Sequence, residues 1–281
     1  MKCLVINLDR SRDRLAHMTA ELARIGVAFE RVAAIDACNP SDMAASAPYR
    51  NSFPSNLSDA EIACFLSHIA CWRIVAESND AYAAILEDDV LISAVARPLF
   101  ADSDWIPADA DIVKLETVFS KTSVSRMHTS VGYGHSVSRL LGGHLGTAGY
   151  IVSKRAARDL IEATYELAAQ VDCVMFDPAF QTSWRKTTYQ LIPALCMQTQ
   201  FLSDDEAVLP SQIIDATPRA PATPASEKRK RSTREKVLTE FKRIWHQASE
   251  ITHLEREMII PFRYHGKSVR PPRPGHRLKA L

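Results

Sequence analysis

Apolar and polar residues alternate in blocks over the first 90 positions, and the block lengths predict strands and helices in turn. Residues 3–8, CLVINL, form an apolar run with the length of a buried strand, and residues 29–35 form another. Between them, apolar residues recur every three or four positions over 15–25, and Gly26 follows as a helix-ending residue. Strand, helix and strand in this order are typical of parallel α/β folds.

The pattern continues further along the chain. Ser58 and Glu61 form a capping-box sequence, which predicts the start of a helix with an apolar stripe. Residues 82–86 and 111–115 have the length and apolar character of further buried strands. Residues 120–139 are polar, and we predict a mobile loop there. The sequence therefore indicates a sheet of several buried strands joined by helices.

Three consecutive carboxylates, Glu87, Asp88 and Asp89, follow the predicted strand over 82–86. Like charges repel, and burying them unpaired is costly, so this cluster needs a positive partner. In extended chain Glu87 and Asp89 point to one side, and ligands of open α/β sheets bind beyond the carboxyl ends of strands. Two converging carboxylates suit Mg²⁺ or Mn²⁺, and a solvated turn is the alternative interpretation.

The turn after the first predicted strand carries polar and basic residues in place of glycines. The dinucleotide fingerprint GxGxxG is absent there and no GxxxxGK[ST] occurs, which argues against a dinucleotide dehydrogenase or a P-loop enzyme. Arginine can hold a phosphate through two hydrogen bonds, so this turn is a candidate nucleotide-binding element; a solvated, charged turn is the other interpretation. The residues that it offers in place of glycines are Asn7, Arg10, Arg12 and Arg14.

Other candidates lie further along the chain. His68 is one helical turn from Cys64, where a packed or surface histidine is the alternative to a functional one. Residues 142–149 are rich in glycine in a chain with only nine glycines, as a tight bend or a close approach of backbone to ligand requires. Glu116 ends a predicted strand, and Asp172 follows a predicted helix.

The overall composition excludes several classes of protein. The chain has 281 residues, 46% of them hydrophobic, and its net charge of +1 gives no reason to expect a nucleic acid as partner. The six cysteines include no CxxC pair and no grouping with zinc-ligand spacing. We expect no signal peptide and no transmembrane helix, because no apolar run is long enough, and therefore a cytoplasmic protein with reduced thiols.

The C-terminal quarter differs from the rest. Residues 214–226 contain three prolines and are typical of a linker, which would divide the chain into a domain over 1–213 and an extension over 227–281. Residues 227–257 predict a basic amphipathic helix, which would either lie on an anionic membrane surface or pack against the domain. We predict a poorly ordered tail over 267–281, and we expect the extension to be dispensable for the fold.

Three segments together resemble glycosyltransferase family 25, the lipooligosaccharide galactosyltransferase-like family. They are VINLDRSRDRLAHMTAELARIGVAFERVAAIDA, LSDAEIACFLSHIACWRIVAESNDAYAAILEDDV and GTAGYIVSKRAARDLI. The resemblance covers about residues 2–200, and the segment over 61–90 is its most specific part. Ala63 stands where the family often has glycine, a small change. The resemblance implies a GT-A-like, Rossmann-type mixed sheet flanked by helices, to which this chain adds the basic helical extension.

The family's motifs map onto the candidates already named. The resemblance implies that Glu87 and Asp89 hold a divalent metal, Mn²⁺ or Mg²⁺. It also implies Asp172, Glu116 and His68 as catalytic candidates, with Asp172 the first candidate for the base and Glu116 the second. The implied nucleotide-sugar-binding residues are Asn7, Arg10, Arg14, Ser67, His68, Asp88, Gly146, Thr147 and Gly149.

The implied reaction is inverting transfer of a sugar, galactose first, from a UDP-sugar to a hydroxyl of a saccharide or lipid-linked saccharide. It would take place in the cytoplasm, or on the cytoplasmic face of the inner membrane if the basic helix binds there. Two alternatives remain. One is a nucleotide-sugar-binding or scaffold protein at the membrane without turnover, and the other is a metal-dependent hydrolase that uses the same carboxylates. Product formation with an acceptor saccharide distinguishes the three.

Overall fold

The computed structural model describes residues 1–45, 57–163, 169–180, 185–202 and 255–269. Among these residues nine strands form one sheet, in the order β11-β6-β7-β9-β5-β8-β3-β1-β2. The elements in chain order are β1 (Lys2–Asn7), α1 (Arg12–Arg24), β2 (Glu30–Ala33), α2 (Pro40–Ala45), α4 (Asp59–Glu77), β3 (Tyr82–Glu87), β4 (Val90–Ile92), α5 (Ala96–Ala101), β5 (Ile112–Lys114), β6 (Lys121–Gly132), β7 (His135–Leu140), β8 (Gly149–Ser153), α6 (Lys154–Ala163), α7 (Val171–Phe176), β9 (Thr188–Ile192), β10 (Cys196–Gln198), η2 (Thr199–Phe201), β11 (Glu255–Ile259), β12 (Phe262–Tyr264) and β13 (Lys267–Val269).

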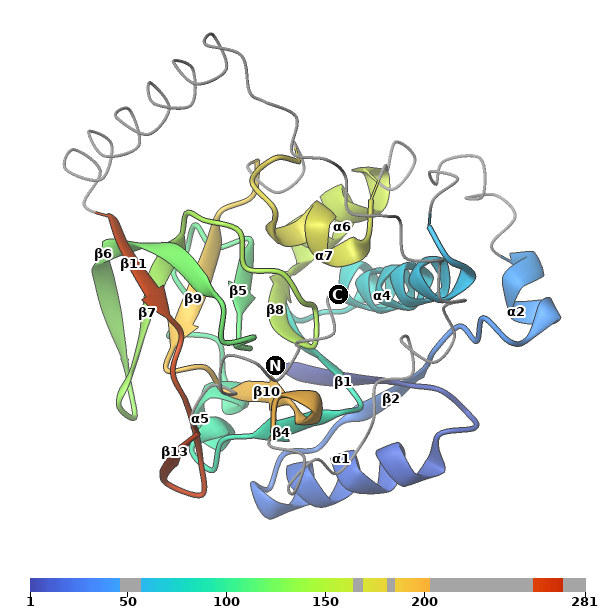
Figure 1. Cartoon of the computed structure of the whole chain (residues 1–281), viewed down its shortest axis with the longest axis horizontal. Helices are drawn as coiled ribbons and strands as arrows, with labels where there is room; N and C mark the ends of the chain where they lie inside the picture. Colours follow the sequence, from blue (N-terminus) through green and yellow to red (C-terminus); the bar gives the residue numbers. More distant parts are fainter. Residues whose placement is uncertain (46–56, 164–168, 181–184, 203–254, 270–281) are drawn as a thin grey trace, which may run out of the picture.

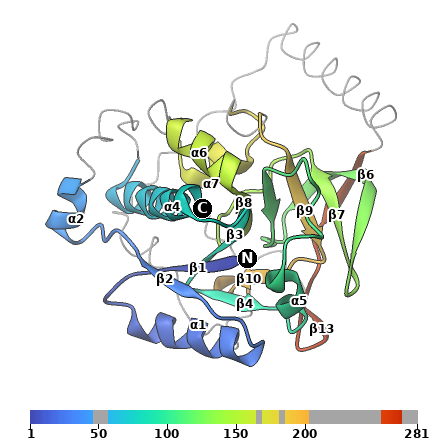
Figure 2. The same cartoon turned by 180° about the vertical axis from the view of Figure 1, so that it is seen from behind.

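The sheet is mixed, as the resemblance implied. Strands β2, β1 and β3 are parallel neighbours, which confirms the predicted strand–helix–strand order. Strand β8 then runs antiparallel between β3 and β5, and β9 runs parallel to β5 and antiparallel to β7. Helices cover both faces: α4, α6 and α7 lie on one side of the sheet and α1 on the other (Figure 1), an arrangement that the view from behind repeats (Figure 2). The α/β prediction is confirmed.

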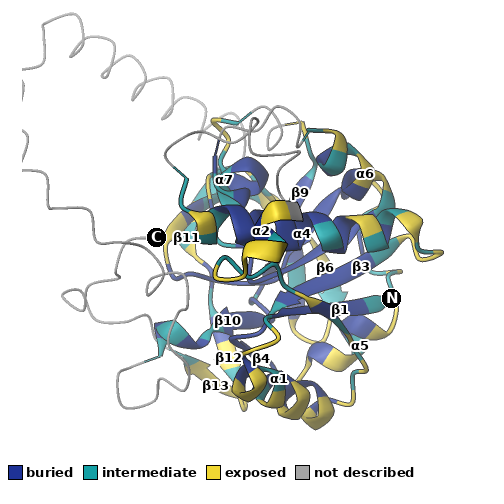
Figure 3. Cartoon of the chain, turned by 90° about the vertical axis from the view of Figure 1, so that its right-hand side faces the viewer, coloured by how far each residue is buried: buried dark blue, intermediate teal, exposed yellow. Residues whose placement is uncertain are grey.

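Strand β3 shows how the sheet is buried on both faces. Ala83 and Ile85 belong to the core beneath α4, α6 and α7, whereas Ala84 and Leu86 belong to the core beneath α1 and α5. A strand buried on both faces has a continuous apolar sequence, which is why the run over 82–86 predicted it well. Figure 3 shows the same division, with buried strands inside and exposed residues on the outer face of α1.

Two helix-end predictions are confirmed. Ser58 Oγ accepts a hydrogen bond from the Glu61 N–H at 3.2 Å, and Glu61 Oε2 accepts one from the Ser58 N–H at 2.7 Å, which completes the capping box of α4. Gly26 follows α1 with φ +66°, a conformation that favours glycine. These features determine where α4 begins and where α1 ends.

The mobile loop predicted over 120–139 is wrong. These residues form β6 and β7, an antiparallel hairpin that pairs with β11 on one side and β9 on the other. The turn lies at Gly132, Tyr133 and Gly134, all with positive φ. Much of β6 is exposed, so its polar side chains face water while its backbone pairs in the sheet. Polarity marked solvent exposure in this segment and not the absence of a strand.

The predictions for the C-terminal quarter need correction where the structure describes it. The helix predicted over 227–257 lies outside the described residues as far as position 254, but its last three residues begin the strand β11. Strands β12 and β13 then pair with one another, so the tail predicted as poorly ordered begins as a strand and lies outside the described residues from 270. Both predicted boundaries of the linker, at 213 and 226, also fall outside the described residues and stay predictions.

The described C-terminal segment is part of the folded body. Strand β11 pairs with β6 over five residues, and the Thr117 hydroxyl donates a hydrogen bond to the Ile260 carbonyl. Ile260 and Phe262 are fully buried in a third core cluster, with Val124 and Met197. These contacts argue against the expectation that residues 227–281 are dispensable for the fold, and a truncation tests it. Within the described part of the chain, none of the helices combines the length and apolar character that crossing a bilayer requires.

Candidate active site at the carboxyl ends of β1 and β3

The acidic triplet lies where two parallel strands end side by side. Strand β1 ends at Asn7 and β3 ends at Glu87, and Ile6 is the register partner of Glu87. Since the carboxyl ends of parallel strands meet at one edge of a sheet, the triplet opens into a cleft there. The first turn, α4 and β10 complete the walls of the cleft, which include Arg10, His68 and Gln198.

Asp88 has the positive partner that the triplet required. Arg14, which is buried on α1, donates from Nη1 to Asp88 Oδ1 at 2.8 Å and lies 3.5 Å from Asp89 Oδ2. Asn7 Nδ2 donates to Asp88 Oδ2 at 2.7 Å. Burial nevertheless raises the pKa of Asp88, because Arg14 and Asn7 offset only part of the desolvation. Arg14 is thus committed to the acidic triplet and not exposed for a phosphate.

Glu87 and Asp89 both face the side-chain amide of Gln198, and their predicted role as metal ligands stays a prediction. The Gln198 amide nitrogen lies 3.5 Å from Glu87 Oε2 and 3.3 Å from Asp89 Oδ1. Burial and the charge of Glu87 raise the pKa of Asp89 to about 7. Burial also acts to raise the pKa of Glu87, but His68, Thr147 and Arg14 outweigh it and lower the pKa. Gln198 was not among the predicted site residues, because its contact depends on the pairing of β10 with β4.

The three carboxylates and one guanidinium fit a divalent cation. Three acidic side chains lie at one strand end; Arg14 contacts Asp88 and Asp89, and His68 lies 3.4 Å from Glu87. Burial, and after it the charge of Glu87, raise the pKa of Asp89. Carboxylate oxygens are the ligands that Mg²⁺ and Mn²⁺ prefer, so Glu87 and Asp89 suit such an ion.

Asn7 positions the strand ends. Its Nδ2 donates to Asp88 and, at 3.0 Å, to the Ser11 carbonyl, while its Oδ1 accepts from Arg31 Nε at 2.9 Å. These contacts use both donors and the acceptor of the amide. The Asn7 side chain therefore fastens the acidic triplet to the first turn. Arg31 escaped prediction because nothing in the sequence of β2 distinguishes it from a surface arginine.

Arg10 and Ser67 line the cleft on either side of the loop after β2. Arg10 Nε donates to Asp36 Oδ2 at 2.7 Å, and this contact, chiefly, lowers the pKa of Asp36. Ser67 Oγ donates to the Ala63 carbonyl and accepts from the Ile35 N–H at 2.9 Å. Arg10 remains half in solvent, so its guanidinium has donors that a phosphate in the cleft could use.

His68 is almost fully buried on α4 and faces the acidic triplet. Its Nδ1 lies 3.0 Å from the Tyr150 hydroxyl, which also accepts a hydrogen bond from Trp72 Nε1 at 2.8 Å. Its Nε2 lies 3.4 Å from Glu87 Oε1. The structure thus brings His68 to the predicted metal-binding carboxylate. Tyr150 and Trp72, which hold the ring, come from β8 and α4 and were not predicted.

The glycine-rich segment approaches the triplet through Thr147, whose hydroxyl donates to Glu87 Oε1 at 2.9 Å. Gly146 has φ +96°, and a Cβ there would come within 3.1 Å of the Glu116 carboxylate. A Cβ at Gly149 would lie 2.2 Å from Cys196 Sγ, so packing against β10 explains this glycine. The glycine density therefore follows from a tight turn and close internal packing.

The two candidate bases occupy different surroundings. Asp172, half-buried on α7, accepts from the Gly146 N–H at 3.1 Å. Glu116 is fully buried, and its Oε1 accepts from Lys114 Nζ at 2.9 Å and from the Ala148 N–H at 3.0 Å. Burial raises the pKa of Glu116 and Lys114 offsets part of this effect. Glu116 lies behind the glycine-rich segment, and neither Glu116 nor Asp172 is among the residues that line the cleft.

The sequence model of glycosyltransferase family 25, described as lipopolysaccharide biosynthesis proteins, matches residues 1–175. A sheet with an acidic strand end beside a basic first turn is the site that the resemblance implied. The chain belongs to glycosyltransferase family 25.

Named relatives share most of the chain. The lacto-N-neotetraose biosynthesis glycosyltransferase LgtE of Neisseria meningitidis serogroup B is 35% identical over 208 residues, which cover 69% of this chain and 72% of LgtE. LgtB of the same strain is 33% identical over 69% of this chain and 74% of its own length. The lipooligosaccharide biosynthesis protein lic2B of Haemophilus influenzae is 27% identical over 74% of this chain and 80% of its own length.

Similarity to solved structures is weaker. A glycosyltransferase involved in the glycosylation of the major capsid of PBCV-1 aligns with a TM-score of 0.41 and 11% identity, over 73% of this chain and 95% of that chain. The galactosyltransferase LgtC, in complex with donor and acceptor sugar analogs, aligns with a TM-score of 0.35 and 11% identity, over 74% of this chain and 92% of that chain.

Proposed function

We propose that this glycosyltransferase moves a hexose, galactose first, from a UDP-sugar to a saccharide hydroxyl of lipooligosaccharide, with inversion and with dependence on a divalent cation. The observation that carries the proposal is that Glu87 and Asp89 both face the Gln198 amide nitrogen at the wall of the cleft, next to Asp88, which Arg14 holds. The relatives LgtB and LgtE, named for lacto-N-neotetraose biosynthesis, support the saccharide acceptor.

The residues of the acidic triplet and of the first turn have different roles in the proposed reaction. Bound Mg²⁺ or Mn²⁺ would be held by Glu87 and Asp89 and would supply positive charge to the diphosphate of the donor. Asp88, held by Arg14 and Asn7, keeps the strand end rigid, because its carboxylate is already engaged on both oxygens. Arg10 donates to a donor phosphate from the wall of the cleft.

We assign the base to Asp172. Its carboxylate is half-buried beside the glycine-rich segment, and it can take the proton of the attacking hydroxyl in inverting transfer. Glu116 is less suited, because Lys114 and the Ala148 N–H occupy one of its oxygens and no surface of the residue is exposed. Ser67 and His68 line the donor side of the cleft in this arrangement.

The test measures sugar transfer with and without the divalent cation, and with and without an intact acidic triplet. Incubation with UDP-galactose, a saccharide acceptor and Mn²⁺ should release UDP and give a product one hexose heavier by mass spectrometry. EDTA should abolish transfer, and Asp89→Asn should reduce kcat by at least about 100-fold in a folded protein, as loss of a group that stabilises developing charge does. Asp104→Asn, the same change at an exposed aspartate, is the control and should retain activity.

The outcomes of this experiment separate the alternatives. Full turnover of Asp89→Asn, or turnover that survives EDTA, would sink the metal assignment. Hydrolysis of UDP-galactose at a rate that acceptor saccharides do not change would favour a hydrolase. Donor binding by calorimetry with no product from a panel of UDP-sugars and acceptors would favour a binding or scaffold protein.

We also propose that the protein is cytoplasmic and lies peripherally on an anionic membrane, through the basic residues of 227–243. The support is the sequence alone, since these residues lie outside the described ones. Each lysine or arginine near an anionic surface contributes about 1 kcal/mol. Changing Lys228, Arg229, Lys230 and Arg231 to Gln should therefore reduce pelleting with vesicles that contain phosphatidylglycerol. Unchanged pelleting at low salt would dismiss the proposal.

A further inference from the structure

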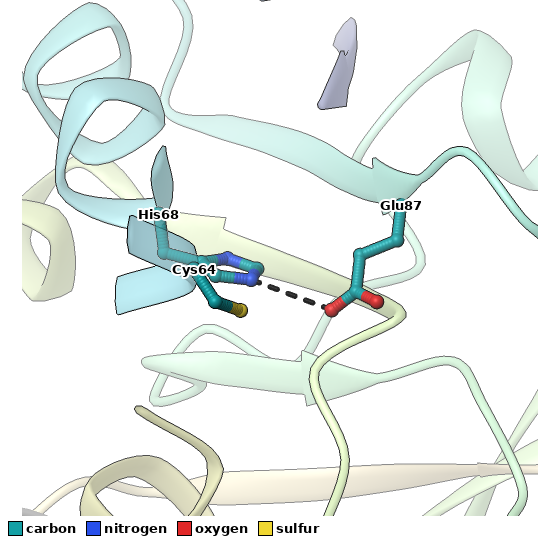
Figure 4. A group of neighbouring side chains, drawn as sticks. All are labelled: Cys64, His68 and Glu87. Carbon is teal, nitrogen blue, oxygen red and sulfur yellow. Dashed lines mark ion pairs between the residues drawn. The ribbon is translucent and has the colours of Figure 1, made fainter. Parts of the chain in front are cut away.

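Three side chains with different donor atoms meet in the cleft: Cys64, His68 and Glu87 (Figure 4). The Cys64 sulfur, a ring nitrogen of His68 and a carboxylate oxygen of Glu87 all lie within 4.8 Å of one another. Cys64 and His68 are one turn apart on α4, and Glu87 ends β3. The sequence showed no zinc-ligand spacing because the third donor comes from a different element of the fold.

His68 is held in the orientation that a metal ligand needs. Its Nε2 is buried and has no hydrogen-bond partner, and it points toward Glu87 Oε1, 3.4 Å away. On the other side of the ring, Nδ1 meets the Tyr150 hydroxyl at 3.0 Å. A metal-bound histidine donates its second ring N–H to such an oxygen, which leaves the lone pair of Nε2 free for the ion. The unpartnered nitrogen thus has its outer support already in place.

The spacing fits a tetrahedral ion. Zn²⁺ lies about 2.0–2.1 Å from imidazole nitrogen and carboxylate oxygen, so two such ligands in a tetrahedron lie about 3.3–3.4 Å apart. His68 Nε2 and Glu87 Oε1 lie 3.4 Å apart, and the Cys64 sulfur lies within 4.8 Å of the other two donor atoms. All three side chains line the cleft, so a fourth ligand, water or substrate, could reach the ion from it.

We propose that Cys64, His68 and Glu87 form a three-ligand site for a thiophilic divalent cation such as Zn²⁺. A thiolate and an imidazole select Zn²⁺ or Co²⁺ over Mg²⁺, which prefers oxygen ligands. The site shares Glu87 with the cation site proposed for transfer but differs from it in its other donors. Binding here does not rest on the proposed transferase function, since it requires neither donor nor acceptor.

The charges around Cys64 favour a cation. The Glu87 carboxylate lies within 4.8 Å of the Cys64 sulfur. Negative charge beside the thiol attracts a divalent ion, which would replace the thiol proton. The free cysteines of the described residues otherwise divide into Cys3, Cys71 and Cys196 in the core, half-buried Cys173 and exposed Cys38.

The experiment titrates the full-length reduced protein with Co²⁺ and records the absorption spectrum. A thiolate bound to Co²⁺ gives a charge-transfer band in the near ultraviolet, and a tetrahedral ion gives intense visible bands. Both should appear in the wild type and in Cys38→Ser, the matched control at an exposed thiol, and both should be lost or greatly weakened in Cys64→Ser.

Zn²⁺ calorimetry and X-ray absorption complete the test. Cys64→Ser should weaken Zn²⁺ binding by at least about tenfold, the lower end of the loss that even outer-shell changes cause. In the Cys38→Ser protein, which keeps the whole site, the zinc absorption edge should show a sulfur neighbour at about 2.3 Å. This second measurement holds even if Cys64→Ser fails to fold.

Three results would overturn the proposal. They are the absence of the charge-transfer band in the wild type, its loss in Cys38→Ser but not in Cys64→Ser, and a zinc shell without sulfur. Failure of sugar transfer with any donor would leave these measurements untouched, so the two proposals fail independently.

Discussion

Lys114 and Glu116 form an ion pair that exposes no surface to solvent. Lys114 Nζ also donates to the Gly146 carbonyl and lies 4.0 Å from the centre of the Phe176 ring. The pair therefore connects β5 to the glycine-rich segment and to α7, and it holds the turn from which Thr147 reaches Glu87. A buried pair is costly to form but more costly to break, because the remaining charge has no partner.

Lys114→Met should lower the free energy of unfolding by about 3–5 kcal/mol. The remaining Glu116 must then hold a proton in the folded state. A protein with a carboxyl whose folded-state pKa lies above its unfolded value loses stability as pH rises. The loss of stability of Lys114→Met relative to wild type should therefore be larger at about pH 8 than at about pH 5. Urea unfolding of both proteins at the two pH values measures this.

The double variant Lys114→Met/Glu116→Gln is the control, because it removes both charges and leaves a side-chain oxygen for the Ala148 N–H. It should be more stable than Lys114→Met alone, a non-additivity that neighbouring residues show. Additive losses in the double variant would mean that the pair is not coupled as described.

Single site residues could be predicted where their charge stands out in the sequence. Residues that reach the site only through strand pairing were missed. The triplet over 87–89 was visible because charges rarely end a buried strand, and Asn7 and Arg14 were visible by their place in the first turn. Gln198 and Arg31 reach the site through strand pairing, which no local pattern records. The role of each predicted site residue in transfer stays a prediction.

Glu21 fastens α1 to two other elements. Its carboxylate accepts hydrogen bonds at 2.8 Å from Arg24 Nη2, the Ile92 N–H and the Tyr264 hydroxyl. Burial alone would raise the pKa of Glu21, but these three partners outweigh it and hold the pKa below 4.5. One side chain thus joins α1 to β4 and to β12.

Glu21→Gln should lower the free energy of unfolding at neutral pH by about 1.5–3 kcal/mol, the range for a hydrogen bond to a charged group. A folded-state pKa below the unfolded one gives stability that is present above 4.5 and lost as pH falls through the folded-state pKa. The difference between wild type and variant should therefore shrink on acidification, as urea unfolding at neutral and acidic pH can show.

Tyr264→Phe, the matched control for that network, removes one hydrogen bond and keeps the charge, so it should cost about 1 kcal/mol. A Glu21→Gln variant whose deficit stays constant down to acidic pH would contradict the assignment of the lowered pKa to this network.

The strands that could be predicted from the sequence are those that are buried along their whole length. The apolar runs behind β1, β3 and β5 face helices on both sides or lie inside the sheet, so their sequences are continuous and apolar. The hairpin of β6 and β7 was missed because half-exposed strands carry polar side chains. Strand β11 was missed because its alternating charges fit a basic helix equally well, and only pairing with β6 decides between them.

One edge strand of the sheet, β11, comes from a segment far along the chain. Strand β11 pairs with β6, and the buried Ile260 and Phe262 complete a core with Val118, Phe119 and Phe201. The C-terminal strands therefore pair and pack with the rest of the sheet, although the family model ends at residue 175.

A truncation after residue 202 should lower the thermal midpoint markedly or prevent folding, because it removes two fully buried apolar side chains, each contributing about 1.5–3 kcal/mol, and leaves the edge of β6 unpaired. A truncation after residue 269 keeps every described strand and is the control. Differential scanning calorimetry of the two proteins checks the expectation. Equal midpoints would show that β11 to β13 add nothing to the fold.

The position of β11 also bears on synthesis. Domains generally begin to fold from the N-terminus while the ribosome is still translating. Here β6 is made with residue 121 onward, but its partner strand begins only at residue 255. The nascent chain therefore carries β6 without its partner while residues 133–254 are made, and over that interval the edge of β6 is open to pairing with another chain.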